Sequence, residues 1–256
     1  MQSSKNRQIN KQRLEIDDAR VRQDRGGREI QNLTLRTIPD AEFTLIEPHL
    51  EYVELAPHLV LHEPGNRIDF AYFLNSGLIS LVIVTADGRS VEVAMVGKEG
   101  VAGTPLALGL RKSPHRAIVQ ISGAGYKVKF EAVDAVMRNA PEMRTMLNRY
   151  VLAQGLQVAQ IAACNRLHEI EQRLARWLLM CQDRVDSDRL PITHQFLAQM
   201  LGTGRPSVSL AAGILQRAGI IENLRGVVKI VQRKLLEDSA CECYCAIQAF
   251  DPRVGI

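Results

Sequence analysis

The sequence lacks long apolar runs and the patterns that mark an enzyme. No stretch of its 256 residues approaches the roughly 18 apolar residues that a membrane-spanning helix needs. The first 29 residues have no apolar core of the kind found in a signal peptide. No P-loop, Ser-His-Asp combination or paired-carboxylate site stands out. These absences predict a cytoplasmic protein that is not an enzyme and has no cofactor.

The composition is ordinary for a globular protein. Hydrophobic residues make up 46% of the chain and charged residues 23%, and the length gives room for two domains with separate cores. The formal net charge is only +4, which permits nucleic-acid binding without demonstrating it. Composition alone therefore does not indicate the function, and the order of motifs along the chain is more informative.

The N-terminal segment, residues 1–32, is polar and contains Gly26-Gly27 close to its end. This composition predicts a flexible or partly helical tail rather than a folded unit. The alternative is a basic arm that contacts DNA, but Asp17, Asp18 and Asp24 lie among its basic residues and weigh against that interpretation.

Short β-rich runs alternate with glycine turns from about Leu50 to Lys129. This spacing predicts a compact antiparallel barrel or jelly roll. Asp87-Gly88, between two apolar runs, is a strong hairpin signal. We assign residues 33–140 to this β-roll sensor domain.

Helical periodicity follows. Glu131–Asn139 reads as a short helix, and Pro141 suits the first turn of a long helix over 141–164. About 24 residues would span about 36 Å, too long to hide on a small barrel. The apolar seam is therefore expected to pack against a second copy, although it could instead cover its own barrel. The predicted dimer-interface residues are Met143, Met146, Tyr150, Val151, Val158 and Ile161.

The C-terminal part, residues 165–236, contains a helix-turn-helix pattern. His168–Cys181 forms an opening helix, Thr193–Leu201 and Pro206–Arg217 form the helix pair, and glycines at 202 and 204 form the turn. Thr193 is expected to cap the first helix. Ala198 lets the two helices approach each other, and Val208 holds the second helix inward.

Two short β-branched runs, Ile220–Glu222 and Val227–Val231, then indicate the hairpin of a wing. The second helix of such a motif meets base edges with its N-terminal end, and the wing and first helix meet phosphates. The predicted DNA contacts are Thr193, Gln195, Thr203, Arg205, Ser207, Ser209, Arg225 and Lys229.

This order of elements resembles the cyclic-AMP receptor protein/FNR (Crp/Fnr) family of bacterial transcription regulators. The resemblance covers roughly residues 40 to 235 and is carried by Gly65, Tyr72, Phe73, Leu74 and Gly77 and by the segment ITHQFLAQMLGTGRPSV. It implies an α+β fold in which a cyclic-nucleotide-binding-like β-roll and a long dimerisation helix precede a winged helix-turn-helix. It also implies a homodimer on a palindromic operator, with RNA polymerase as a further partner.

The family's cyclic-AMP site is altered in this sequence. Thr104 stands where the family has a glutamate that accepts the ribose hydroxyl, and the family's Arg-Ser-Ala is replaced by His115-Arg116-Ala117. Ala159 and Gln160 stand where a Thr-Ser pair would reach the adenine. We expect a different effector or none, unless a one-residue shift restores the role of Arg116. The effector-pocket candidates are Gly103, Thr104, His115, Arg116 and Ala117.

The recognition helix also departs from the cyclic-AMP receptor. Arg205 matches the family arginine that reads guanine, and a guanidinium suits that base because it can bond O6 and N7 together. Pro206 replaces a glutamate that accepts from cytosine, and Leu210 replaces an arginine. The operator should therefore differ from that of the cyclic-AMP receptor.

The last segment, 237–256, is a cysteine-containing tail whose ACECY motif resembles a subgroup of the family. An FNR-type iron–sulfur cluster is not expected, because no cysteine precedes position 164. The C-x-C spacing of Cys241, Cys243 and Cys245 is tighter than that of structural zinc sites. We expect no metal, and three reduced cysteines in a tail packed on the winged helix. A soft metal or a redox disulfide is the alternative, since thiols of one extended stretch would share a side.

The resulting hypothesis is a sequence-specific transcription regulator that binds a palindromic operator as a homodimer, with an unidentified effector or none. The alternative is a ligand-binding or scaffold module whose DNA-binding domain has degenerated. Arg205, together with Gly202 and Val208, favours the regulator.

Overall fold

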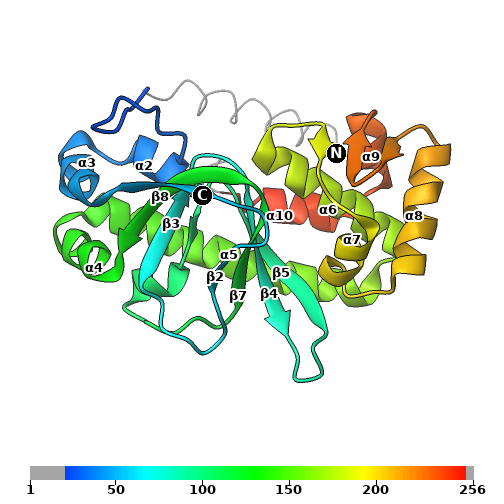
Figure 1. The fold of residues 1–256 in the computed structure, drawn as a ribbon, viewed down its shortest axis with the longest axis horizontal. Coiled ribbons are helices and arrows are strands. Elements are labelled where there is room, and N and C mark those ends of the chain that lie inside the picture. The colour runs from blue at the N-terminus through cyan, green and yellow to red at the C-terminus, as the bar shows by residue number, and fades with distance from the viewer. Residues whose placement is uncertain (1–20, 252–256) are drawn as a thin grey trace.

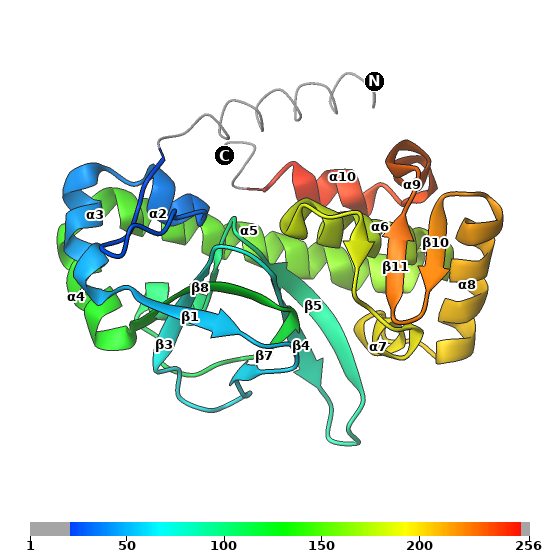
Figure 2. The same ribbon diagram turned by 45° about the horizontal axis from the view of Figure 1, so that its top comes forward.

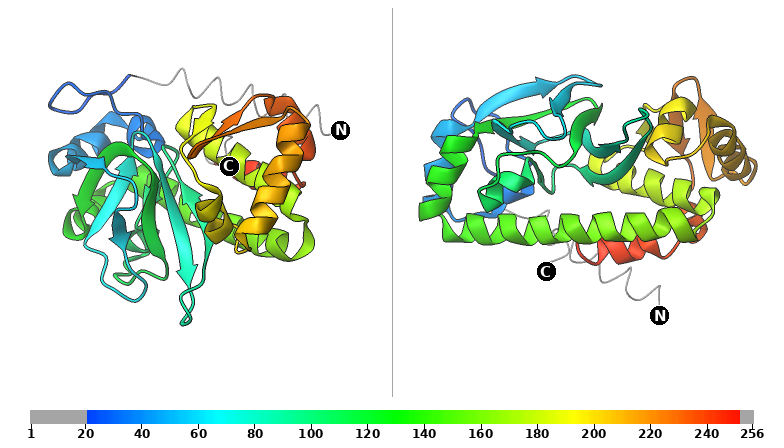
Figure 3. Two further views of the ribbon diagram at one scale, coloured as in Figure 1. Left: turned by 45° about the vertical axis from the view of Figure 1, so that its right-hand side comes forward. Right: turned by 90° about the horizontal axis from the view of Figure 1, so that it is seen from below.

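The computed structural model describes residues 21–251 (Figure 1). A β-rich body and a smaller, mainly helical body lie side by side along one long helix, α5 (Pro141–Leu167). Seen from below, α5 passes under both bodies (Figure 3). It is therefore the element through which the two bodies are joined in sequence and in space.

The β-rich body consists of two four-stranded antiparallel sheets. One sheet has the order β1-β8-β3-β6, built from β1 (Glu51–Leu55), β8 (Gly123–Lys129), β3 (Phe70–Leu74) and β6 (Val101–Ala102). The other has the order β2-β7-β4-β5, built from β2 (Val60–His62), β7 (Arg116–Ile121), β4 (Leu78–Val84) and β5 (Ser90–Val96). Apolar side chains from both sheets fill the space between them.

Glycine residues shape two of the turns in the β-roll. The β4–β5 hairpin closes at Asp87-Gly88 as predicted, and its arm extends away from the body (Figure 2). Gly77 precedes β4 with a φ of +84°, and a Cβ there would lie 2.7 Å from the carbonyl oxygen of Ile121. Only glycine meets both conditions, so this turn depends on that residue.

Short helices close the roll. They are α2 (Leu33–Thr37), α3 (Asp40–Ile46), the 3-10 turns η1 (Glu47–His49) and η2 (Thr104–Leu108), and α4 (Phe130–Asn139). Part of the predicted flexible tail is also ordered against this end. Ile30 is buried, and the buried Arg22 donates to the carbonyls of Leu35 and Ile38 and pairs with Asp40. The tail prediction is therefore wrong for residues 21–32, and residues 1–20, with any basic arm there, lie outside the described part of the chain.

The dimer seam predicted on α5 faces this chain's own core. Met143, Tyr150 and Ile161 are buried, and Met146 and Val158 pack partly against the same apolar clusters. Val151, the sixth residue of the predicted seam, is half-buried. Periodicity identifies an apolar face but cannot say which body covers it. The outward face is a different one, with Leu152, Gly155, Ala159 and Ala162 exposed at helical spacing.

The helix α5 also runs past its predicted end at 164 to Leu167. It stops at His168, whose extended backbone (φ −115°, ψ 149°) turns the chain into α6 (Ile170–Val185). A capping box between Glu169 and Gln172 begins α6.

The smaller body surrounds α6. Its helices are α7 (His194–Met200), α8 (Arg205–Arg217) and α9 (Arg233–Ser239), and its sheet has the order β10-β11-β9, with β10 (Ile221–Leu224), β11 (Val227–Ile230) and β9 (Arg189–Leu190). The predicted fold class, a β-roll followed by a long helix and a winged helix-turn-helix, is confirmed.

The two bodies are bonded through buried polar groups. Trp177 on α6 donates from Nε1 to Glu92 Oε1 at 2.8 Å, and Arg184 Nε lies 2.8 Å from Glu99 Oε1. Burial raises the pKa of Glu92 to about 7, although hydrogen bonds from Ser80 and Trp177 oppose the shift. These contacts tie α6 directly to the β-roll.

The C-terminal tail differs from the prediction. Cys243 begins a helix, α10 (Cys243–Gln248), so the three tail cysteines do not lie in one extended stretch. This helix packs along α5 and α6, where Figure 3 shows it beside the long helix, rather than only on the winged part. Within the described residues, no helix is both long and apolar enough to cross a membrane.

Candidate nucleic-acid interface

The helix-turn-helix is formed by α7 and α8. The side chain of Thr193 caps α7 by accepting from the backbone N–H of Phe196 at 3.2 Å. Gly202 has a φ of +61°, which reverses the chain, and the N–H of Thr203 returns to the carbonyl of Ala198 at 2.9 Å. The turn is thus set by a cap, a glycine and one backbone bond, as the sequence predicts.

The outer end of α8 carries the residues expected to meet bases. Val208 and Ala211 are buried beneath the helix, which turns Arg205, Ser207 and Leu210 to the surface. Arg205 is the first residue of the helix, and Pro206 follows in the first turn, where a missing N–H costs no helical bond. The guanidinium is therefore presented at the positive end of the helix dipole.

Ser209 has a partner inside the domain. His194 Nδ1 lies 3.1 Å from Ser209 Oγ, and His194 Nε2 lies 3.1 Å from Asn223 Oδ1. Asn223 donates in turn to Gln216 Oε1 at 2.8 Å. This network joins α7, α8 and β10, so Ser209 orients the motif in this state. His194, which the sequence did not single out, is its central residue, and no sequence spacing marks it.

The wing presents two cations differently. Arg225 is exposed in the turn between β10 and β11, beside Gly226. Lys229 is held across the hairpin by Glu222 at 3.2 Å. Gln195 is exposed and Thr203 is half-buried. Apart from the Thr193 cap, Ser209 and Lys229, the predicted contacts form no side-chain hydrogen bond within residues 21–251, so they are free to meet DNA. The His194 network joins Ser209 on α8 to Asn223 on β10, so the structure holds the recognition helix and the wing together.

A cleft of about 830 Å³ separates the helix-turn-helix from the β4–β5 hairpin. Arg89 lines it from the hairpin, Arg173 from α6, and Arg205 from α8. Gly202 also touches the hairpin, because a Cβ there would lie 3.1 Å from Val91 Cγ2. In this conformation the recognition end of α8 therefore faces the β-roll hairpin.

The effector candidates lie in the β-roll beside α5. Thr104 Oγ1 lies 2.7 Å from Gln154 Oε1 on α5, and Arg116 Nε pairs with Glu63 at 2.9 Å. Gly103 adopts a φ of +102° before η2, and Ala117 faces His62 across strands β2 and β7. Burial lowers the pKa of His62 to about 4 and of His115 below its usual value. Thr104 and Arg116, the polar side chains expected from the family resemblance to meet a nucleotide, are thus both bonded within the chain.

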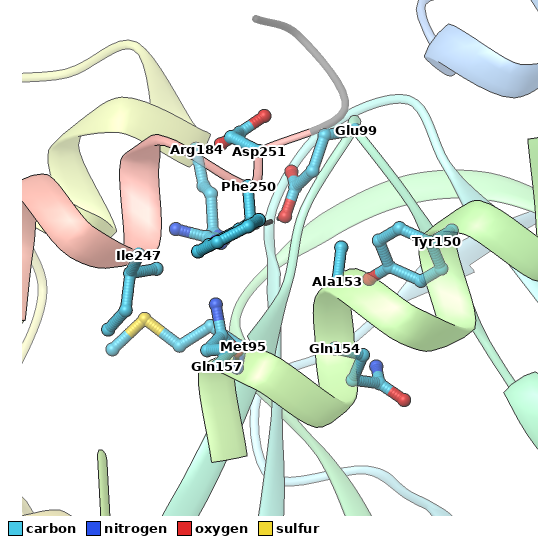
Figure 4. A pocket seen from close by; sticks show the side chains of 10 residues that line it. All are labelled: Met95, Glu99, Tyr150, Ala153, Gln154, Gln157, Arg184, Ile247, Phe250 and Asp251. Carbon is cyan, nitrogen blue, oxygen red and sulfur yellow. Dashed lines mark hydrogen bonds and ion pairs between the residues drawn. The ribbon is translucent and has the colours of Figure 1, made fainter. Parts of the chain in front are cut away.

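A small cavity also lies where α5, α6 and α10 meet (Figure 4). Figure 4 shows Glu99 and Arg184 at its rim, with Tyr150 and Gln157 from α5 and Phe250 and Asp251 from the tail. Its free volume is about 20 Å³, which suits a water molecule rather than an effector.

Comparison with known proteins relates these features to a family. Residues 172–239 match the Crp-like helix-turn-helix domain. The structure of FixK2 from Bradyrhizobium japonicum is similar, with a TM-score of 0.64 at 14% identity over 75% of this chain and 98% of that one. No curated protein matches the chain.

Two further structures share the fold. CLP of Xanthomonas campestris, described as a c-di-GMP responsive global regulator, has a TM-score of 0.62 at 15% identity over 75% of this chain and 99% of its own. A Crp/FNR-family transcriptional regulator from Eubacterium rectale has a TM-score of 0.61 at 18% identity over 78% and 94%. At these identities the likeness establishes the fold. The matched domain identifies residues 172–239 as a Crp-like helix-turn-helix, and the similar structures show that the chain has the fold of Crp/FNR-type regulators.

Proposed function

We propose that the chain binds a palindromic DNA operator as a homodimer, with α8 in the major groove. The observation that supports this most directly is the exposed N-terminal end of α8, where Arg205 and Ser207 point outward above the buried Val208. Helix-turn-helix regulators read base edges with this part of the second helix. Arg205 would bond a guanine, and Thr193, Gln195, Thr203, Arg225 and Lys229 would meet the backbone.

The dimer would form along the outward face of α5. Leu152 is 60% exposed, and Gly155, Ala159 and Ala162 follow it on the same side. Small residues at this spacing allow two helices to approach closely, and an exposed leucine gains from burial. A pair of α8 helices would then contact half-sites about 34 Å apart.

The β-roll is proposed to bind an effector other than cyclic AMP, or no effector. Thr104 bonds Gln154 instead of offering a carboxylate to a ribose, and Arg116 already pairs with Glu63. A cyclic phosphate would have to break that ion pair to use Arg116. RNA polymerase would be a further partner of the DNA-bound dimer.

Selection of binding sites from random DNA tests the proposal. The purified chain should enrich one inverted repeat with half-sites a helical turn apart, and the repeat should differ from the site of the cyclic-AMP receptor. Enrichment of no motif would favour the alternative, a ligand-binding or scaffold module with a degenerate DNA-binding domain. Enrichment of a single unrepeated half-site would instead contradict the dimer.

A further inference from the structure

A group of four side chains brings together the end of α5 and the tail. Cys164 lies in the last turn of α5, His168 caps that helix, Cys241 precedes α10 and Cys243 begins it. The three cysteines form a buried cluster of their own, and His168 lies at its edge. All five cysteines of the chain are in the described residues, and none of them forms a disulfide there.

The distances in this group match those around one metal ion. Cys164 Sγ and Cys241 Sγ are 3.5 Å apart, and Cys243 Sγ is 3.6 Å from His168 Nδ1. All four ligand atoms lie within 4.8 Å of one another. A tetrahedral zinc ion with the usual bond lengths separates two sulfurs by about 3.8 Å, and a sulfur and a nitrogen by about 3.6 Å. The cluster thus has the size of a single tetrahedral site.

The surrounding groups would orient these ligands. His168 turns its other nitrogen, Nε2, to Glu242 Oε1 at 3.1 Å, and carboxylates hold zinc-binding histidines in this way. Gln160 Nε2 donates to Cys243 Sγ at 3.1 Å. Both nitrogens of His168 are therefore engaged, with Nδ1 aimed at the sulfurs.

The local charge also suits a metal thiolate. Arg176 is only 1% exposed, and its Nε has no hydrogen-bond partner in the part of the chain that the structure describes. Its guanidinium is a neighbour of Cys164. Three thiolates and one neutral imidazole around Zn²⁺ carry a single negative charge, which this buried cation would balance.

We propose that Cys164, His168, Cys241 and Cys243 bind one tetrahedral zinc ion. The donor set favours zinc because three sulfurs and one imidazole are characteristic of closed structural sites. A two-iron cluster would stand between its ligand pairs and hold them farther apart. The ion would join His168, at which α5 turns into α6, to Cys241 in the segment that leads into α10.

Metal analysis of the full chain, purified with a thiol reductant, tests the site directly. We expect one zinc per chain, and loss of stoichiometric zinc in Cys241→Ser and Cys243→Ser. Cys245→Ser and Cys181→Ser are matched controls, because both cysteines lie outside the group, and they should keep the ion. Loss of zinc from all four variants alike would overturn the assignment.

A second measurement does not depend on the folding of the cysteine variants. Chelator-treated wild-type protein is titrated with Co²⁺, which should give the visible ligand-field bands of a tetrahedral site and thiolate-to-cobalt charge transfer. His168→Cys should still bind and shift these bands, whereas His168→Ala should bind Co²⁺ more weakly, because it removes one of the four ligands. Glu242→Gln should keep the spectrum and bind zinc about 10-fold more weakly.

Three other results would overturn the proposal. They are a protein that takes up neither Zn²⁺ nor Co²⁺, one that contains iron with acid-labile sulfide, and one in which Cys164 and Cys241 form a disulfide despite the reductant. The last would be seen in intact mass as the loss of the thiol hydrogens.

Discussion

At the residue scale, Arg205 is the side chain of α8 whose chemistry is best suited to specify a base. Arg205 is exposed at the first position of α8, and its neighbours Pro206 and Leu210 have no charge to offer. Ser209, by contrast, is bonded to His194 within the domain. Specificity should therefore depend on few direct base contacts, with Arg205 foremost.

We expect Arg205→Ala to weaken binding to the selected operator by about 1–3 kcal/mol and to remove discrimination at one guanine, because a guanidinium bonds O6 and N7 together. Gel shifts on the operator and on single-base variants measure both effects. Arg217→Ala is a suitable control, since it removes the same charge from the far end of the same helix. If Arg205→Ala weakened DNA binding equally on every sequence, Arg205 would contact a phosphate rather than a base.

At the scale of single elements, α5 has different partners on its two sides. One side is buried against the β-roll and α10, and the other exposes Leu152 among small residues. The exposed side is the one proposed for the dimer. The C-terminal end of the same helix supplies Cys164 to the proposed zinc site, so this element would connect dimer, sensor and tail.

Leu152→Glu should shift the chain from dimer to monomer, because two carboxylates would be buried against each other at the interface. Sedimentation equilibrium should give twice 28.5 kDa for the wild type and the single value for the variant. Leu110→Glu serves as the control, since Leu110 is 58% exposed but lies on the β-roll. If both variants stay dimeric, the interface lies elsewhere.

At the scale of the whole molecule, buried polar bonds set how the DNA-binding body sits on the β-roll. Glu92 accepts from Trp177, and Glu99 pairs with Arg184, both between β-roll and α6. The hairpin also lies close to Gly202. A change in the β-roll would therefore reach the helix-turn-helix through α6 and the hairpin rather than through α5 alone.

The buried Glu92 makes stability depend on pH. Burial raises its pKa to about 7, whereas an exposed glutamate titrates near 4.5. Between about pH 4.5 and pH 7, Glu92 therefore keeps its proton in the folded chain but has released it in the unfolded chain. This contribution to the free energy of unfolding is complete below about pH 4.5 and falls by up to about 1.4 kcal/mol per pH unit until about pH 7.

We expect Glu92→Gln to lose this dependence, because an amide can accept from Trp177 and donate to Ser80 without ionising. Urea unfolding between pH 5 and pH 8 should show the variant gaining stability over the wild type as the pH rises. Glu54→Gln, at an exposed position, should follow the wild-type curve. If the difference in unfolding free energy between Glu92→Gln and the wild type did not change with pH, the result would contradict a buried, protonated carboxyl.

The sequence by itself determined the local elements. Asp87-Gly88 predicted the hairpin, Thr193 and Gly202 the cap and turn of the helix-turn-helix, and Pro141 the start of α5. These signals are local, because a turn or a cap depends on the backbone of a few neighbouring residues. The family resemblance rested on the order of the same elements.

Only the tertiary structure decided which surfaces and side chains meet. Much of the apolar seam of α5 packs on the core of its own chain, because periodicity identifies an apolar face without identifying what covers it. His194 was found only through its contacts with α8 and β10. Cys164 and Cys241 lie 77 positions apart in the sequence yet 3.5 Å apart in space. No spacing rule covers such a pair, because long-range packing brings it together.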